Sequence, residues 1–449
     1  MSTLTTERPV LADTQASTAS ALRFITCGSV DDGKSTLIGR LLLDSRSVLQ
    51  DQLAHVTHQA SGQINAAELA RLTDGLQAER EQGITIDVAW RYFATPQRKF
   101  IIGDAPGHEQ YTRNMVTAAS QADCAVVLVD ATKLAWAATG DGDHALLPQT
   151  RRHALLAQLL RVPHIVFAIN KLDAVADASA VYTRIRSALQ TFADEAGLDV
   201  RAIIPVSALT GWNVVDRHAD WAGYQGPALL ELLEQLPREP HATQLPAALP
   251  VQWVESNSAS SDTDRSRRVL WGRIAEGTLQ PGDSVQVFPS GQHATVVQLL
   301  DHGRRPLEQA AAPASTGVIL DRELDISRGD WLLAAGAPRP RNQFSATIAW
   351  LDTEPLQVGR VYWALHGHRW IKAKVTRITH QLDIHTLQTQ EASQLAANAI
   401  GQVELTLQAA IPLQPYALSR SQGAMILVDS ASNATAAALL VQAEVEEDF

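Results

Sequence analysis

Residues 28–35 read Gly-Ser-Val-Asp-Asp-Gly-Lys-Ser, which matches the G-x-x-x-x-G-K-S pattern of phosphate-binding loops. The apolar run 22–27 precedes this stretch and the helix-like run 36–43 follows it. In a strand–loop–helix unit, backbone N–H groups turn inward onto phosphates and the helix adds the positive end of its dipole. The residues expected to bind the phosphates are Gly28, Ser29, Val30, Asp31, Asp32, Gly33, Lys34, Ser35 and Thr36.

Two residues of this loop are expected to contact the phosphates and the metal ion that accompanies them. Lys34 is expected to neutralise phosphate charge, and Ser35 is expected to hold Mg²⁺. Upstream of the next strand, Gly-Ile-Thr-Ile-Asp at 83–87 supplies Thr85. Its hydroxyl and carbonyl are expected to close over Mg²⁺ only when the γ-phosphate is present. The chain therefore carries candidate parts of a switch that senses the third phosphate.

A D-x-x-G loop supplies the remaining candidates for hydrolysis. It follows the apolar run 100–103 and consists of Asp104, Ala105, Pro106 and Gly107, with His108 next in sequence. Asp104 is expected to reach Mg²⁺ through water, and the Gly107 N–H is expected to face the γ-phosphate. His108 is expected to orient an attacking water, the role that glutamine has in many GTPases. The candidate catalytic residues are Lys34, Thr85 and His108.

Two later motifs indicate which base is bound. Asn170, Lys171, Leu172 and Asp173 form N-K-x-D directly after the apolar run 165–169. The Asp173 carboxylate can accept two hydrogen bonds from guanine N1–H and N2–H₂, whereas adenine offers no matching pair of donors. Alone, this motif also fits an ordinary turn after a strand. Because Ser207, Ala208 and Leu209 match the second guanine loop of GTPases, the set predicts GTP.

Each motif follows a short apolar run, so each is expected at the carboxyl end of a parallel strand. Open α/β sheets bind ligands at that edge, and separate loops therefore converge on one site. The predicted fold of this part is an α/β P-loop domain, with a mostly parallel sheet and helices on both faces.

Composition sets outer limits on the function. The chain has 449 residues, of which 45% are hydrophobic and 19% charged, and no apolar stretch is long enough to cross a bilayer. Cys27 and Cys124 both lie in apolar runs and are expected to be buried thiols in a reducing cytoplasm. A net charge of −11 argues against a long nucleic-acid interface. We therefore expect a cytoplasmic protein with no membrane or nucleic-acid partner.

The pattern changes past residue 237. Proline-rich stretches at 237–240 and 245–250 predict a linker. Short alternating strands with frequent turn signals follow, which is typical of small closed barrels. The predicted parts are a disordered leader 1–20, a GTPase domain 21–240, β-barrels 245–338 and 342–440, and an acidic tail 441–449.

The chain resembles a known family. A nucleotide domain followed by two barrels is the plan of translational GTPases such as elongation factor Tu. Longer strings at 24–42, 73–88, 106–115 and 149–153 more closely resemble the GTPase subunit of bacterial sulfate adenylyltransferase. Asp32 belongs to this resemblance, because the translation factors usually carry histidine there.

This resemblance implies a two-subunit enzyme. A smaller partner would bind ATP and sulfate and form adenylylsulfate and pyrophosphate, while this chain, with GTP and Mg²⁺, would hydrolyse GTP to drive that step in a heterodimer. A separate adenylylsulfate kinase is a further candidate partner, since some relatives continue into such a domain and no second G-x-x-x-x-G-K occurs here. The alternative function is an elongation-factor-like GTPase that delivers aminoacyl-tRNA.

Two features follow the segment Asp-Ala-Thr-Lys at 130–133. An insertion at 135–148, relative to the family, is expected to form an exposed tip with unchanged chemistry. After it, Arg151, Arg152 and His153 are expected to open a helix and to meet solvent or carboxylates.

Overall fold

The computed structural model describes residues 21–45, 69, 88–107, 112–133, 146–237, 244–255, 268–383 and 386–443. The chain divides into two compact units between residues 238 and 239. The first contains one open sheet with its helices, and the second contains two closed sheets. This arrangement agrees with the predicted fold class.

The first unit is built on a six-stranded sheet in the order β2-β3-β1-β4-β5-β6. Neighbours pair in parallel except β2, which runs antiparallel to β3 at one edge. The strands are β1 (Leu22–Cys27), β2 (Ala89–Ala94), β3 (Lys99–Asp104), β4 (Cys124–Asp130), β5 (His164–Asn170) and β6 (Val200–Pro205). Every residue of β4 and β5 is buried, as expected for strands covered on both faces.

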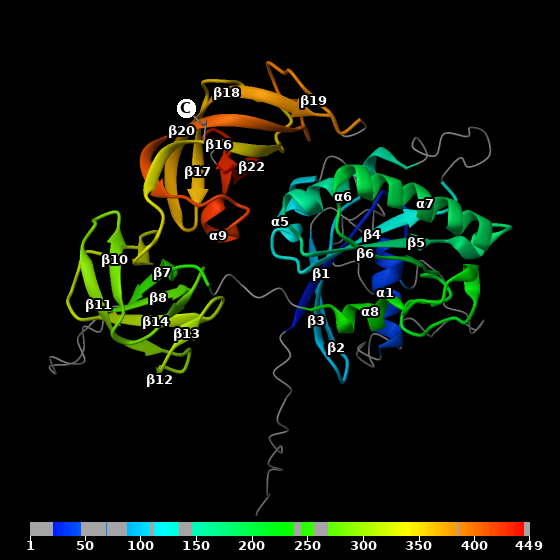
Figure 1. The fold of residues 1–449 in the computed structure, drawn as a ribbon, viewed down its shortest axis with the longest axis horizontal. Coiled ribbons are helices and arrows are strands. Elements are labelled where there is room, and N and C mark those ends of the chain that lie inside the picture. The colour runs from blue at the N-terminus through cyan, green and yellow to red at the C-terminus, as the bar shows by residue number, and fades with distance from the viewer. Residues whose placement is uncertain are drawn as a thin grey trace, which may run out of the picture. The chain divides into compact units, whose positions relative to one another are not determined.

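Helices cover both faces of this sheet, with α5, α6 and α7 on one side and α1 and α8 on the other (Figure 1). They are α1 (Lys34–Asp44), α5 (Thr112–Ala119), α6 (Pro148–Leu159), α7 (Ala178–Ala196) and α8 (Leu229–Gln235), with short 3-10 turns η2 (Leu172–Ala174) and η3 (Trp221–Gly223). Leu37 and Leu41 of α1 share a hydrophobic core with Phe24 of β1 and Leu233 of α8. Because these side chains are fully buried, the core fixes the helix that follows the phosphate loop.

The first closed sheet of the second unit is a ring of β10, β15, β7, β8, β14 and β11, closed by pairing of β10 with β11. The ring strands are β7 (Ala248–Glu255), β8 (Val269–Arg273), β10 (Ser284–Phe288), β11 (His293–Leu300), β14 (Ser315–Leu320) and β15 (Trp331–Ala334). β12 (Pro306–Leu307) adds to β11, and β9 (Thr278–Leu279) pairs with β13 (Ala310–Ala311) in a separate two-stranded sheet. The predicted linker was too long, because Pro250 lies inside β7 opposite Trp331. A proline fits a strand position whose nitrogen need not donate.

The second closed sheet is a ring of β17, β21, β22, β16, β20 and β18, closed by pairing of β17 with β18. Its elements are β16 (Pro340–Trp350), β17 (Val361–His366), β18 (Arg369–Leu382), β19 (Thr389–Gln390), β20 (Ile400–Pro412), α9 (Arg420–Gly423), β21 (Ala424–Val428) and β22 (Thr435–Val441). Alternate residues of β20 are buried, which gives the barrel one inward and one outward face. Two barrels after an α/β domain were the expected plan.

The two barrels contact each other within this unit. The Ser419 hydroxyl, from the residue before α9, donates a hydrogen bond to the Glu276 carboxylate of the first barrel. Arg369 of β18 pairs with Asp330 at 3.0 Å, and the Trp331 and His366 rings stack with centroids 5.3 Å apart. In the described part of the chain, no helix has the length and apolar character needed to span a bilayer.

Candidate nucleotide-binding site

The predicted motifs lie at one edge of the six-stranded sheet. The phosphate loop follows β1, Asp104 ends β3, Asn170 ends β5, and Ser207 follows β6. Since β1, β3, β5 and β6 run parallel within one sheet, their carboxyl ends share an edge. The tertiary structure thus brings together loops that are spread over nearly two hundred residues of the sequence. The sequence predicted this convergence, because each motif follows a short apolar run.

Backbone geometry explains the glycines of the phosphate loop. Gly33 has a φ of 92° at the N-cap of α1, and a Cβ there would lie 2.4 Å from the Asn170 amide nitrogen. Gly28, at the other end of the loop, has a φ of 149°, and its Cβ would lie 2.9 Å from the Leu128 carbonyl oxygen. Only glycine meets both demands without strain, so the loop can curl and present its N–H groups.

Lys34 is almost fully buried, and its ammonium group lies among backbone carbonyls. Nζ donates to the Gly28 oxygen at 3.2 Å and to the Ser29 oxygen at 2.9 Å. A Cβ on Gly107 would lie 2.5 Å from this Nζ, which places the D-x-x-G loop directly against the lysine. Burial lowers the pKa of Lys34, while the Asp104 and Asp32 carboxylates oppose that shift. The ammonium is therefore available to exchange carbonyl contacts for phosphate oxygens.

Ser35 and Asp104 are the described residues that fit Mg²⁺. The Ser35 hydroxyl lies 3.4 Å from Asp104 Oδ2, and the Thr26 hydroxyl donates to Asp104 Oδ1 at 3.2 Å. Mg²⁺ prefers a few protein oxygens together with waters and substrate phosphates. A hydroxyl beside a buried carboxylate at the start of α1 matches that donor set.

Asn170 connects three motifs through its side-chain amide. Nδ2 donates to the Asp32 oxygen at 2.8 Å, and Oδ1 accepts from the Ala208 N–H at 3.0 Å. The guanine motifs and the phosphate loop are thereby fixed to one another. The Ala208 N–H is thereby engaged with Asn170. Arg40 of α1 donates to the carbonyl oxygens of Ala208 and Leu209 and holds this loop in place.

The Lys171 side chain contacts both the phosphate loop and the end of β4. Its Nζ donates to the Asp31 oxygen at 2.6 Å and pairs with Asp130 at 2.7 Å. Burial raises the pKa of Asp130, but hydrogen bonds from Lys171 and Thr132 outweigh that effect and leave the pKa below its ordinary value. Asp173 is exposed, and no described residue donates a hydrogen bond to its carboxylate. Its acceptor oxygens are therefore open to a guanine.

Sequence reasoning missed the role of Gln149 and did not anticipate the burial of Arg151 and His153. Gln149 Nε2 lies 3.4 Å from the Gly107 oxygen and 3.0 Å from Nε2 of His153, so the start of α6 contacts the D-x-x-G loop. Arg151 and His153 do open a helix, but both are buried, and the Arg151 guanidinium packs 4.7 Å from the centre of the Phe192 ring. Burial lowers the pKa of His153 to about 3, so the ring is neutral. The helical repeat places Arg151 and His153 on the buried face of α6. A run of basic residues in the sequence does not by itself reveal this orientation.

Several predicted features lie outside the described residues. Thr85 and His108 are among them, so their roles stay predictions, as does the structure of most of the insertion. The last residues of that insertion are described and are not an exposed tip. Leu146 is buried and Pro148 is the first residue of α6. Proline suits this position because a first-turn N–H has no helical partner.

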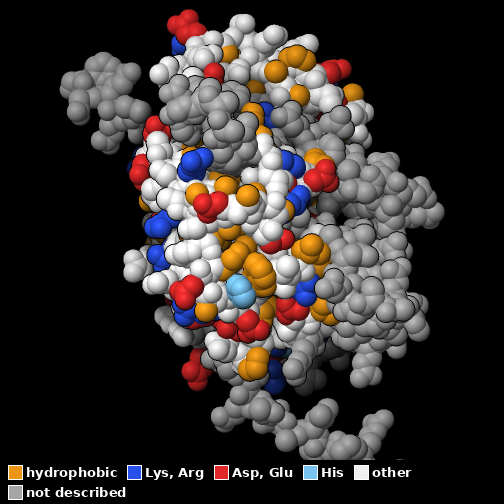
Figure 2. Space-filling model, turned by 90° about the vertical axis from the view of Figure 1, so that its right-hand side faces the viewer, with side chains coloured by type: hydrophobic (Ala, Val, Ile, Leu, Met, Phe, Trp, Pro, Cys, Tyr) orange, Lys and Arg blue, Asp and Glu red, His pale blue; other side chains and the backbone are white. Residues whose placement is uncertain are grey.

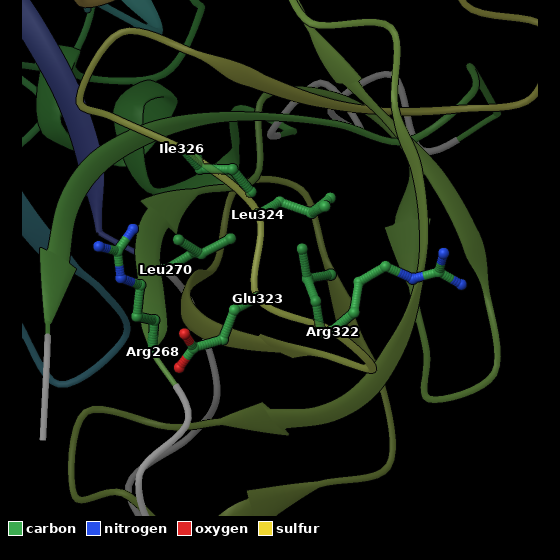
Figure 3. Close-up of a pocket in the computed structure, with 7 residues that line it drawn as sticks. Arg268, Leu270, Arg322, Glu323, Leu324 and Ile326 are labelled. Atoms are coloured by element: carbon green, nitrogen blue, oxygen red, sulfur yellow. The ribbon is translucent and has the colours of Figure 1, made fainter.

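The cavities of the barrel unit differ from this site. The first barrel contains a cavity of about 20 Å³, into which Leu270, Leu324 and Ile326 point while Arg322 points away (Figure 3). This volume is far below the roughly 300–1,000 Å³ of small-molecule sites. Two wider hollows of about 520 and 400 Å³ are lined by no glycine or lysine among the described residues. None of the three resembles a phosphate cradle.

Surface charge agrees with the composition. On the face that Figure 2 shows, Lys and Arg side chains lie scattered among Asp and Glu rather than gathered into a continuous band. A protein that grips nucleic acid over a long surface presents such a basic field. The visible described surface therefore gives no sign of one.

Comparison with known proteins agrees with this site. Residues 19–239 match the family model of the elongation factor Tu GTP binding domain, and residues 343–442 match that of the GTP-eEF1A C-terminal domain-like family. "Sulfate adenylyltransferase subunit 1" of Laribacter hongkongensis is 42% identical over 431 residues, which cover 95% of this chain and 86% of that protein. The chain belongs to the sulfate adenylyltransferase subunit 1 family.

Other members of the family show the same extent of similarity. The Shewanella oneidensis subunit 1 is 45% identical, with 94% of this chain and 85% of that protein covered. "Bifunctional enzyme CysN/CysC" of Xylella fastidiosa is also 45% identical, over 93% of this chain but only 65% of that longer protein. The similarity therefore spans the GTPase domain and both barrels.

Proposed function

We infer that this chain is the GTP-hydrolysing regulatory subunit of a sulfate adenylyltransferase. It couples the hydrolysis of GTP to GDP and phosphate with the formation of adenylylsulfate and pyrophosphate from ATP and sulfate on a partner subunit. The observation that carries this inference is the connected edge of the sheet. There the phosphate loop, Asp104 and the N-K-L-D motif contact one another within a chain of this family.

Each part of this edge has a chemical role in GTP hydrolysis. The phosphate-loop N–H groups and Lys34 bind the β- and γ-phosphates. Ser35 directly, and Asp104 through water, would hold Mg²⁺, which would neutralise charge on the phosphates. Asp173 reads the guanine. Thr85 would close over the metal ion, and His108 would orient water for in-line attack on the γ-phosphate. These roles rest on the match of each residue to its motif.

The partner is proposed to be a smaller subunit that binds ATP and sulfate. Relatives carry the name "subunit 1", which supports a partner chain. A separate adenylylsulfate kinase is the proposed consumer of the product, in the cytoplasm. We propose the domain limits 21–240 for the GTPase and 245–338 and 342–440 for the barrels. The loops around Thr85 and Gly107 are the candidate coupling element, because only the γ-phosphate would hold them closed.

Delivery of aminoacyl-tRNA, the alternative function, is not favoured. The relatives that cover nearly the whole chain are named for sulfate adenylyltransferase. Asp32 occupies the loop position at which translation factors usually carry histidine. The net charge of −11 also disfavours a long RNA interface.

The test combines this chain with the smaller subunit encoded in the same genome. GDP and adenylylsulfate are followed together in the presence of ATP, sulfate, GTP and Mg²⁺. We expect adenylylsulfate to accumulate beyond the equilibrium reached with ATP and sulfate alone, and only while GTP is being hydrolysed. By linkage, ATP and sulfate should also change the affinity of the complex for GTP.

Two controls separate coupling from simple activation. A non-hydrolysable GTP analogue should raise the rate of approach to equilibrium at most, and this chain alone should make no adenylylsulfate. If product rises equally far beyond equilibrium with the analogue, hydrolysis does not drive the reaction and the coupling function is wrong.

A further inference from the structure

Asp32 places a carboxylate inside the loop that is expected to bind phosphates. Its side chain is fully buried, and Oδ2 accepts the Ser29 N–H at 2.6 Å. A buried negative charge is costly unless it is paired, and here it would also repel a bound polyphosphate. The phosphate loop therefore needs a cation dedicated to this carboxylate.

Lys133 is in a position to supply that cation. It lies three residues after the end of β4, 101 positions from Asp32 in sequence, and its Nζ is 3.0 Å from Asp32 Oδ1. The same Nζ donates to the Val30 carbonyl oxygen, so the lysine grips the loop at two points. Its side chain is 31% exposed, whereas that of Asp32 is inaccessible. The Lys133 end of this ion pair is therefore partly accessible to solvent at the rim of the site, whereas the Asp32 end is buried.

Other cations near the loop have different partners. Lys34 donates to the carbonyl oxygens of Gly28 and Ser29 and is the residue expected to move onto phosphate. Lys171 donates to the Asp31 oxygen and pairs with Asp130. Once Lys34 is committed to phosphate, Lys133 is the described cation that still neutralises Asp32.

We propose that Lys133 is a positioning residue of the GTP site, which neutralises Asp32 and holds the phosphate loop in the form that binds the nucleotide. This proposal rests on the proposed GTPase function. Because Lys133 acts through Asp32, its effect must disappear when Asp32 has no charge. GTP, which carries one more phosphate than GDP, should depend on it more strongly.

The test is a double-mutant cycle on nucleotide affinity in the full-length chain. Dissociation constants for GDP and for guanosine 5′-(β,γ-imido)triphosphate are measured by titration for the wild type, Lys133→Met, Asp32→Asn and the double variant. Lys133→Met should weaken binding of the triphosphate roughly 10- to 100-fold, with a smaller loss for GDP. The double variant should bind better than Lys133→Met, because neither charge then stands alone.

Two further variants make the result specific. Lys133→Arg keeps the charge and should restore most of the affinity, which a merely steric role for the lysine would not predict. Lys99→Met removes an exposed lysine of β3 in the same unit and should leave affinity unchanged. Wild-type affinity in Lys133→Met, or strictly additive effects of the two substitutions, would overturn the proposal.

The Asp173→Asn variant separates this proposal from the proposed function. If Asp173→Asn weakens GTP binding and Lys133→Met does not, the GTP site stands and only the positioning role fails. If Asp173→Asn leaves GTP affinity unchanged, the guanine site itself is wrong.

Discussion

At the scale of single residues, Asn170 shows how one side chain organises the site. It is 2% exposed, and its amide bridges the phosphate loop and the Ser-Ala-Leu loop with one donor and one acceptor. Asp173, three positions later in the same motif, is expected to have a different role, because it is exposed. One residue of the motif therefore joins loops, while the other keeps an exposed carboxylate.

Asp173→Asn tests base recognition. An asparagine cannot accept both guanine donors in the same way, so GTP affinity should fall roughly 30- to 1,000-fold. Xanthosine triphosphate, whose C2 oxygen needs a donor opposite it, should instead bind better than it does to the wild type. Titration of both nucleotides measures this exchange. Unchanged GTP affinity would contradict the assignment of Asp173.

His108→Ala tests the hydrolytic step. If His108 acts on the attacking water and not on the bound nucleotide, GTP affinity should stay near normal while turnover falls strongly. The measurements are single-turnover GTP hydrolysis and nucleotide titration on the same preparation. Turnover at the wild-type rate, with the partner subunit present, would remove His108 from the mechanism.

At the scale of elements, α7 (Ala178–Ala196) illustrates how local signals set the bounds of a helix. Asp177 caps its first turn, where its carboxylate accepts the Ala180 N–H at 2.9 Å. Gly197 ends it in the left-handed conformation with a φ of 64°. Both devices satisfy backbone groups that a helix end leaves without partners.

Asp177→Ala should therefore lower the free energy of unfolding by about 1 kcal/mol, because the N–H of the first turn loses its acceptor. Thermal unfolding of the full chain measures the change. Asp177→Asn is the matched control and should retain most of the stability. An alanine variant as stable as the wild type would mean that solvent replaces the cap without cost.

At the scale of the whole molecule, the two barrels meet through a buried polar contact. Glu276 of the first barrel is 3% exposed and accepts a hydrogen bond from Ser419 of the second. Burial raises the pKa of Glu276 to about 7, with the Ser419 hydrogen bond opposing the shift. The buried carboxyl is therefore protonated below neutral pH and charged above it.

This shift gives a signed prediction for stability. With the folded pKa above the unfolded value of 4.5, the contribution of Glu276 is complete below pH 4.5 and is lost as pH rises to about 7. Glu276→Gln keeps a neutral acceptor for Ser419, so it should be more stable than the wild type at pH 8 by about 1–3 kcal/mol and similar at pH 5. Thermal unfolding at both pH values checks this, with exposed Glu391→Gln as control. Identical pH dependence of wild type and Glu276→Gln would contradict it.

Much of the fold could be predicted from the amino-acid sequence alone. The predicted strand 22–27 coincides with β1, and the runs at 100–103 and 165–169 lie within β3 and β5. These strands are rich in apolar residues because both faces of the sheet are covered, which makes them easy to recognise. The barrel strands β17 and β22 were not singled out, since short barrel strands carry a weaker pattern than buried parallel strands.

The sequence by itself determined the chemistry of the site, because the phosphate and guanine motifs are local strings whose function depends on spacing within a single loop. Only the tertiary structure decided which side chains support those loops. Lys133 reaches Asp32 across 101 positions, and Gln149 reaches Gly107 across 42. The burial of Arg151 and His153 was likewise invisible in the sequence. Such contacts depend on how strands and helices pack, and no spacing rule encodes which distant residue a buried charge will meet.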